Sequence, residues 1–311
     1  MLNENKSIKK FLIKIVISSI LIALLFTRID VKSFFNSIGL LNWRYIPLII
    51  SLIVLNYIIS SVRWKYLLIH KNNDKVSLNY LISLYFVGSF FNNFMPTSVG
   101  GDVYKIYRLG KKIGSNSDAF TATFMERFTG LISLVFISMI GFIGTVASYN
   151  RSIEGNVYRI LIASGIFSLL FVFSFLLFLK VINIFKSKFK KISQVYDSIY
   201  IYKDRKDVLG IAVISSFIVQ FLAILSQYLI FVSLGKNLDI YRTMFIFPII
   251  TMATFFIPSL NGIGVQDFLY KFSNNFLFVA EPVAIAGSVL YHLFRLFVSL
   301  FGGVLYAFNK D

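Results

Sequence analysis

Long apolar runs recur along this chain, and they constrain its fold more than any other feature. Stretches such as "VFISMIGFIGTVA" and "ILIASGIFSLLFVFSFLLFL" are apolar on every side, so they suit lipid or other apolar helices rather than water. The composition agrees, because 57% of the 311 residues are hydrophobic and 14% are charged, against about 45–50% and 25% in soluble domains. We therefore expect an all-α, polytopic membrane helical bundle.

Six of the runs are long enough to cross a membrane as helices, which takes about 20 residues each. They lie near residues 11–27, 44–69, 117–147, 157–180, 208–234 and 283–307. The first run also has the basic start of a signal peptide, but no small-residue cleavage site follows it. We interpret it as a retained helix, with a signal peptide as the alternative.

Two further apolar regions, 78–109 and 241–279, are interrupted by Pro and Gly in "FMPTSVGGD" and "FIPSLNGIG". Each region is too broken for one helix and too apolar for a loop, which favours a broken, re-entrant helical hairpin. Three full spans separate the hairpins, so they would enter from opposite faces as an inverted repeat. The alternative is a packing kink in each of two ordinary spanning helices. We expect one transmembrane domain over 1–311, with halves of about 1–147 and 157–311 and no soluble catalytic domain.

A net charge of +17 can indicate a protein that binds nucleic acid, so the placement of the charged residues has to be considered. With two hairpins, most loop cations, such as Lys105, Lys111 and Lys112, fall on one side, and few, such as Lys236, fall on the other. This bias predicts a multi-pass protein of a prokaryotic plasma membrane with both termini in the cytoplasm. It argues against a nucleic-acid partner. The basic segment 180–207 is expected to lie on anionic membrane lipids at the cytoplasmic face.

The chain offers little for metal, cofactor or nucleophile chemistry. It contains no cysteine, and its two histidines, His70 and His292, are far apart with no carboxylate at ligand spacing. It also lacks a paired-aspartate metal motif and a Gly-rich nucleotide loop with lysine. We expect no metal, no cofactor and no catalytic residues.

Charged residues inside the apolar regions mark the candidate site. Asp102 and Asp267 each follow a break, Glu126 and Arg127 lie within a span, and Arg295 interrupts the last span midway. A charge at the bilayer centre costs at least about 2.5 kcal/mol, so several of them imply ion pairing or a polar cavity. Glu126 and Arg127 could each tie two helices together or contact a ligand directly. Arg295 is the strongest candidate for a functional cation.

Two other cations have simpler interpretations. Arg63 lies near the cytoplasmic end of its helix, where we expect it to snorkel to the membrane surface. Lys271 follows the second break and is expected to reach the outer surface.

Four motifs together resemble the lysylphosphatidylglycerol synthase transmembrane region family: "FFNNFMPTSVGGDVYKIYRL", "MERFTGL", "PSLNGIGVQD" and "YHLFRLFVSLFGG". The resemblance covers nearly the whole chain and implies a unit like the lipid-translocating half of the multiple peptide resistance factor. The family's site positions fall on Asn93, Pro96, Gly100, Gly101, Asp102, Tyr107, Arg108, Glu126, Arg127, Asn261, Gly262, Gly264 and Arg295. One departure stands at Gln266 and Asp267, where the family usually has Arg-Glu. This chain keeps the carboxylate there but loses the cation.

The function that we favour at this point is a flippase-like lipid translocase. It would move a phospholipid, an aminoacylated phospholipid or a polyprenyl-phosphate-linked lipid between leaflets through a polar cavity between the hairpins. Arg295 and the backbone N–H groups of the two tips would receive the phosphate. Asp102, Glu126 and Asp267 would receive an amine or a coupling proton.

Two other classes stay open. One is a lipid-modifying enzyme, such as a phosphatidylglycerol lysyltransferase. The other is a non-transporting partner subunit of a separate lipid synthase or glycosyltransferase.

Overall fold

The computed structural model describes residues 31–68, 76–94, 100–148, 180, 200–257, 259 and 261–308. Every regular element among them is helical. The α-helices are α2 (Val31–Gly39), α3 (Ile46–Tyr66), α4 (Leu78–Phe94), α5 (Gly100–Ile113), α6 (Asn116–Ser148), α9 (Lys206–Ser233), α10 (Ile240–Phe256), α11 (Val265–Leu277) and α12 (Glu281–Phe308). Two short 3₁₀ helices, η1 (Trp43–Tyr45) and η3 (Ile201–Asp204), precede α3 and α9. The all-α prediction is confirmed for the described part of the chain.

Four helices are long and apolar enough to cross a membrane: Trp43–Tyr66, Asn116–Ser148, Lys206–Ser233 and Glu281–Phe308. They coincide with four of the predicted spans. The predicted span at 11–27 lies outside the described residues, as does all of 157–180 except residue 180. The protein is therefore a membrane protein with several spanning helices.

Each interrupted region forms two helices rather than one. In the first region α4 ends at Phe94 and α5 begins at Gly100, and in the second α10 ends at Phe256 and α11 begins at Val265. Pro96 and Pro258 lie outside the described residues, directly after the helix ends. The breaks therefore fall where the Pro and Gly residues predict them.

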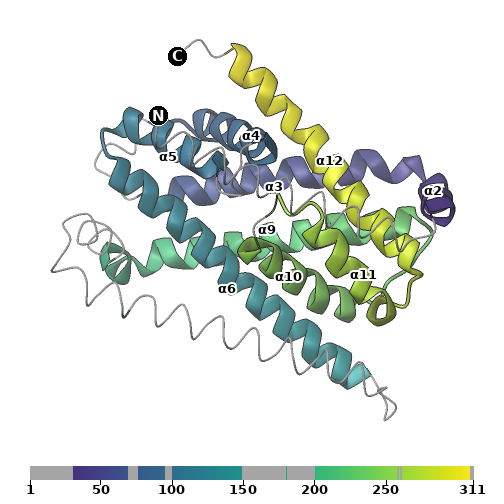
Figure 1. Cartoon of the computed structure of the whole chain (residues 1–311). Coiled ribbons are helices and arrows are strands. Elements are labelled where there is room, and N and C mark those ends of the chain that lie inside the picture. The colour runs from purple at the N-terminus through teal and green to yellow at the C-terminus, as the bar shows by residue number, and fades with distance from the viewer. Residues whose placement is uncertain are drawn as a thin grey trace, which may run out of the picture.

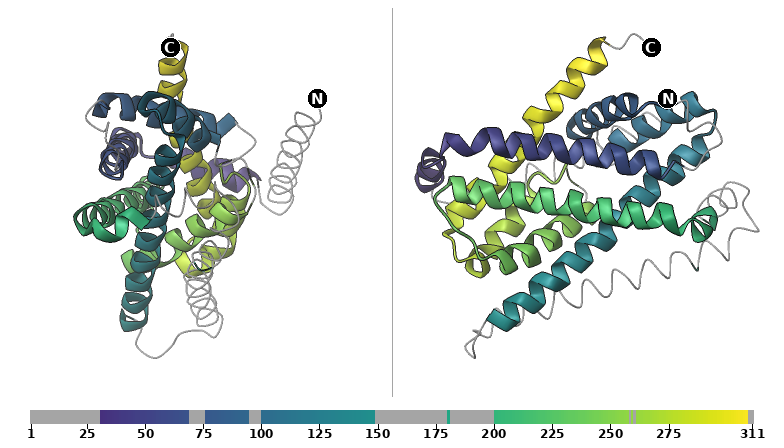
Figure 2. Two further views of the ribbon diagram at one scale, coloured as in Figure 1. Left: turned by 90° about the vertical axis from the view of Figure 1, so that its left-hand side faces the viewer. Right: turned by 180° about the vertical axis from the view of Figure 1, so that it is seen from behind.

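The long helices α3 and α9 run side by side through the middle of the molecule (Figures 1 and 2). The other two long helices, α6 and α12, cross them obliquely. Helix α10 packs along α6, and α4 packs along α12. The two short helices that follow the breaks, α5 and α11, pack against α6 and α12 respectively.

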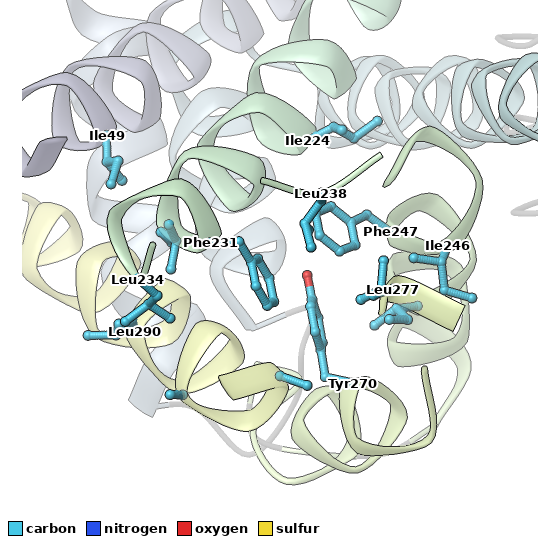
Figure 3. Close-up of a cluster of buried hydrophobic side chains, with 14 of the residues drawn as sticks. Ile49, Ile224, Phe231, Leu234, Leu238, Ile246, Phe247, Tyr270, Leu277 and Leu290 are labelled. Atoms are coloured by element: carbon cyan, nitrogen blue, oxygen red, sulfur yellow. The ribbon is translucent and has the colours of Figure 1, made fainter. Parts of the chain in front are cut away.

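Apolar side chains both fill the bundle and cover its outside. Figure 3 shows the larger core, where Phe231 of α9, Phe247 of α10 and Tyr270 of α11 pack with their rings 5.3–5.9 Å apart. Large apolar side chains such as Ile143 and Ile214 are 62% and 64% exposed on the outside. An apolar exterior over an apolar core suits a bundle that is surrounded by lipid.

Candidate functional site

A polar cavity of about 260 Å³ lies between the helices that meet at the two breaks. Its charged lining residues come from α3, α5, α6 and α12: Arg63, Asp102, Lys105, Arg127 and Arg295. Asparagine, glutamine, serine and threonine side chains of α3, α4, α9, α10 and α11 complete the polar lining. A polar, charged cavity inside an apolar bundle is the usual form of a substrate site in membrane proteins.

Asp102 holds two cations at one end of this cavity. Its carboxylate accepts from Arg127, with Nη2 2.8 Å from Oδ2, and lies 3.2 Å from Nζ of Lys105. Asp102 stands in the first turn of α5, where a negative charge also stabilises the helix N-terminus. The Arg127 side chain is 41% exposed, so its guanidinium is accessible while it is paired.

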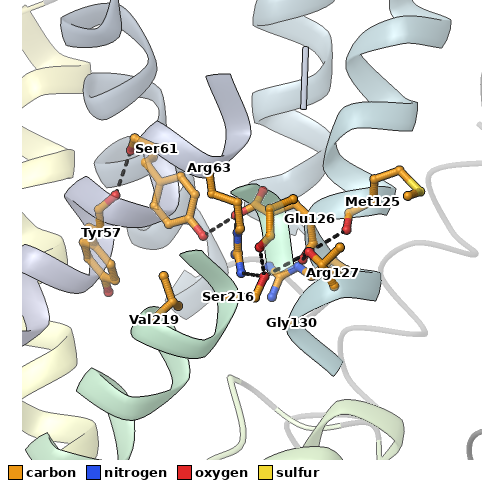
Figure 4. Close-up of polar contacts among 12 residues, drawn as sticks. Tyr57, Ser61, Arg63, Met125, Glu126, Arg127, Gly130, Ser216 and Val219 are labelled. Atoms are coloured by element: carbon orange, nitrogen blue, oxygen red, sulfur yellow. Dashed lines mark hydrogen bonds and ion pairs between the residues drawn. The ribbon is translucent and has the colours of Figure 1, made fainter. Parts of the chain in front are cut away.

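Glu126 lies at the centre of a second group of charged side chains and is buried, with only 1% of its surface exposed. Its carboxylate accepts from Nη2 of Arg63 at 3.0 Å, from the Tyr85 hydroxyl at 2.7 Å and from Nζ of Lys105 at 3.3 Å. Arg63 also donates to the Ser216 hydroxyl at 2.8 Å (Figure 4). Glu126 thus joins α3, α4, α5 and α6, and α9 is linked through Arg63.

Arg63 and Lys105 correct two assignments made from the sequence. Arg63 was expected to snorkel, but it is 4% exposed and pairs with Glu126. Lys105 was grouped with the cytoplasmic loop cations, but it is 3% exposed and pairs with both carboxylates. Its Nζ also lies 4.1 Å from the Tyr85 ring centroid, a cation–π distance. A missed signal was the spacing of Asp102 and Lys105, because residues three apart share one helix face.

Asparagine side chains satisfy freed backbone groups and join the two breaks. The Gly101 N–H donates to Oδ1 of Asn92 at 2.8 Å, so α4 holds the start of α5. Asn93 of α4 accepts a hydrogen bond from the Asn261 amide at the second break. Asn93 also donates to the Ser299 hydroxyl of α12 at 2.7 Å. The two breaks, far apart in sequence, are therefore neighbours in the fold.

The second break is a turn with three residues in the left-handed region. Asn261, Gly262 and Gly264 have φ angles of 49°, 87° and 83°. Asp267 accepts the Gly264 N–H at 2.9 Å and so caps α11 at its start. The turn places Asn261 and Gly262 on the cavity wall.

Arg295 enters the cavity from α12, about midway along that helix. Its Nη2 donates to Oδ1 of Asn261 at 3.3 Å, and its guanidinium lies 5.4 Å from the Tyr291 ring centroid. Among the described residues, no carboxylate lies within ion-pair distance of it. Arg295 is thus a cavity cation without a described counter-ion.

Most of the predicted site residues fall into three groups. Asp102, Arg127, Asn261, Gly262 and Arg295 line the cavity, whereas Asn93, Gly100, Gly101 and Glu126 support it from behind. Gly264 and Asp267 form the turn and cap beneath the cavity wall. Arg108 is not brought to the cavity: it lies farther along α5, and its carbonyl accepts a hydrogen bond from the Tyr80 hydroxyl.

Lys271, which the sequence predicts to reach the outer surface, forms an ion pair in the structure. Its side chain is 18% exposed, and its Nζ lies 2.8 Å from Oε1 of Glu281. It pairs with the start of α12 rather than standing free.

The charges around the cavity do not cancel. Four cations, Arg63, Lys105, Arg127 and Arg295, line it, against the carboxylates of Asp102 and of Glu126 directly behind. Asp267, beneath the cavity wall, is a third carboxylate, so the four cations exceed the nearby carboxylates by one, which favours an anionic guest. The described ranges hold no cluster of three His, Asp or Glu side chains that could bind a metal ion.

Comparisons with known proteins match the chain to families of membrane proteins. The family described as "Lysylphosphatidylglycerol synthase TM region" matches residues 11–303. A UPF0104 membrane protein of Pyrococcus horikoshii is 26% identical over 298 residues, covering 86% of this chain and 88% of the relative. Another, from Methanocaldococcus jannaschii, is 27% identical over 222 residues, covering 70% of this chain and 93% of the relative. No solved structure matches the chain. On the family match over nearly its whole length, this chain belongs to the lysylphosphatidylglycerol synthase transmembrane region family.

Proposed function

We propose that this protein is a lipid translocase that takes a phosphate-bearing lipid headgroup into the cavity while the acyl or prenyl tails stay in the membrane. The observation that carries the proposal is the polar cavity inside an apolar bundle, because its four cations outnumber the nearby carboxylates. Phospholipids, aminoacylated phospholipids and polyprenyl-phosphate-linked lipids share the phosphate that such a site would recognise. Arg295 is its best placed partner, because no described carboxylate competes for it.

The three carboxylates have a smaller part in this proposal than the cations do. Asp102 and Glu126 already accept from Arg127, Lys105 and Arg63. An incoming amine would have to displace one of these cations, whereas a phosphate can bind the half-buried Arg127 and Arg295, which line the cavity. The headgroup phosphate is therefore the feature that we expect the site to recognise.

An inverted repeat of α3–α6 and α9–α12 would give the cavity two alternating entrances. In such a repeat α3 corresponds to α9, α4 to α10, α5 to α11 and α6 to α12. The helix contacts support it, because each contact in one half has a counterpart between the corresponding helices. Helix α4 packs on α12 as α10 packs on α6, and α6 packs on α9 as α12 packs on α3. Glycines stand at the matching contacts: Gly302 of α12 meets the α4 backbone at Phe86, and Gly141 of α6 meets the α10 backbone at Phe245.

A labelling experiment tests the orientation that this repeat requires, in the cytoplasmic membrane of a prokaryotic host. The chain has no cysteine, so each variant would carry a single reactive thiol: Lys111→Cys in the exposed last turn of α5, and Lys236→Cys in the exposed loop after α9. With cytoplasmic termini and two re-entrant hairpins, a membrane-impermeant maleimide should label Lys236→Cys in intact cells. It should label Lys111→Cys only after permeabilisation. Labelling of both variants in intact cells, or of neither, would contradict the arrangement.

Arg295→Ala should slow lipid movement at least about tenfold, because a desolvated, charge-assisted hydrogen bond is worth about 1.5–3 kcal/mol. Purified protein would be reconstituted into phosphatidylglycerol and phosphatidylethanolamine liposomes that carry fluorescent phosphatidylglycerol. The rate at which label becomes accessible to dithionite measures translocation. Arg295→Lys, which keeps the charge but not the planar fork, should have an intermediate rate.

Arg205→Ala is the matched control for this test. Arg205 precedes α9 far from the cavity lining, and its side chain is 47% exposed. Its removal should leave the rate unchanged. A wild-type rate no faster than protein-free liposomes with each of the three lipid classes would refute the translocase. Recovery of a chemically modified lipid would favour an enzyme instead.

A further inference from the structure

Asp267 of α11 and His292 of α12 form a buried pair that the phosphate site does not use. Their side chains are 5% and 9% exposed, and Oδ1 of Asp267 lies 3.7 Å from Nε2 of His292. Both of these atoms are shielded from solvent and have no hydrogen-bond partner. Two facing polar atoms left unsatisfied in a low-dielectric interior are costly and call for a missing group between them.

The geometry restricts what that missing group can be. Oδ2 of Asp267 accepts the Gly264 N–H at 2.9 Å, and Oδ1 is the oxygen left without a partner. One carboxylate oxygen and one imidazole nitrogen are too few ligands for a metal ion. A proton needs no more than these two atoms, and an approach of about 1 Å would bring them to hydrogen-bond distance.

We propose that Asp267 and His292 together bind one exchangeable proton, which the protein takes up along with an anionic headgroup. This inference rests on the proposed function and adds a coupling ion to it. The shared proton would tie α12 to the start of α11. His292 also lies against the second break, since a Cβ built on Gly262 would be 3.7 Å from its Cε1. Proton binding would thus act on the part of the cavity wall formed by Asn261 and Gly262.

Arg295 supplies the link between proton and anion. It stands three residues after His292 on α12, so the two side chains share one helix face. While Arg295 is an uncompensated cation, it opposes the addition of a second positive charge nearby. An anion bound to Arg295 removes this opposition, and by reciprocity a proton on the pair must strengthen anion binding.

The surrounding elements contribute few other titratable groups. Four charged or titratable side chains lie near the pair, either next to it or one side chain away. They are Arg295 and Tyr291 of α12, Tyr270 of α11 and Tyr57 of α3. The Tyr270 hydroxyl donates to Gln227 of α9. From α10 the cavity wall receives Thr251 and Thr254, and from α4 near the break Ser89 and Asn92, none of which titrates. Acid-induced changes at this end of the cavity should therefore come from Asp267 and His292.

Calorimetry with dioctanoyl phosphatidylglycerol as the probe tests the inference on the purified full-length protein. This phosphodiester keeps one negative charge between about pH 5 and pH 8, so a pH effect on binding belongs to the protein. The wild type should bind it about tenfold more tightly at pH 5.5 than at pH 8. Parallel titrations in two buffers of different ionisation enthalpy should show net proton uptake on binding.

Asp267→Asn and His292→Gln should each reduce the pH effect to less than about twofold and abolish proton uptake. The asparagine can still accept the Gly264 N–H, so the α11 cap is kept. Glu281→Gln is the matched carboxylate-to-amide control: Glu281 pairs with Lys271 outside the cavity lining, and this variant should keep the wild-type pH dependence.

The outcomes separate this inference from the function on which it rests. Wild-type binding without proton uptake would overturn the shared proton and leave the lipid site standing, even if neither variant folds. Proton uptake retained in both folded variants would also overturn it. If the wild type binds no lipid at any pH, the proposed function fails and the inference fails with it.

Discussion

Glu126→Ala is expected to lower the free energy of unfolding by about 3–5 kcal/mol, the usual cost of breaking a buried ion pair from one side. The Glu126 side chain is 1% exposed and lies 3.0 Å from Arg63 and 3.3 Å from Lys105. Removing the carboxylate leaves two buried cations with only Asp102 nearby to compensate them. The Tyr85 hydroxyl loses its acceptor as well. The loss should appear as a lower unfolding temperature and a lower yield of monodisperse protein in mild detergent.

Glu281→Ala provides the control for this prediction, because it removes the same side chain from a more exposed ion pair. Glu281 is 35% exposed and pairs with Lys271 at 2.8 Å. A partly exposed pair contributes little, so the expected loss is about 1 kcal/mol or less. Equal losses in the two variants would show that the Glu126 cluster is not the main tie among α3, α4, α5 and α6.

The spanning helices and the two breaks could be predicted from the sequence because their signals are local. Proline followed closely by glycines disfavours a continuous helix, and the observed helices end at Phe94 and Phe256, just before Pro96 and Pro258. Apolar length alone identified α3, α6, α9 and α12. None of these inferences depended on which helix packs against which.

The partners of the charged residues could not be predicted in the same way, because burial is a property of the assembled fold. Arg63 and Glu126 are 63 positions apart in sequence, and only packing of α3 against α6 brings them within 3.0 Å. Lys105 stands in the run "YKIYRLGKK", which has the composition of a basic loop. It is buried because α5 begins inside the bundle, directly after the first break. The contact between Asn93 and Asn261 likewise follows from the meeting of the two breaks.

Gly101→Ala should lower the free energy of unfolding by about 3 kcal/mol or more, because the backbones of α4 and α5 touch at this residue. A Cβ at Gly101 would lie 1.8 Å from the Gly88 carbonyl oxygen and 2.5 Å from its carbonyl carbon. Backbone atoms cannot turn aside as a side chain can, so the two helices would have to separate. That shift would pull the Gly101 N–H from Asn92 and displace Asp102 from Arg127. Lipid movement should therefore fall together with stability.

Gly210→Ala is the matched substitution, since a Cβ at Gly210 of α9 meets nothing within 4 Å. Alanine is the better helix former by about 1 kcal/mol, so this variant should be as stable as the wild type or slightly more stable. If Gly101→Ala were tolerated as well as Gly210→Ala, the close approach of α4 and α5 would not be required. The start of α5 would then not fix the position of Asp102. The ion pair between Asp102 and Arg127 would have to be positioned by α6 alone.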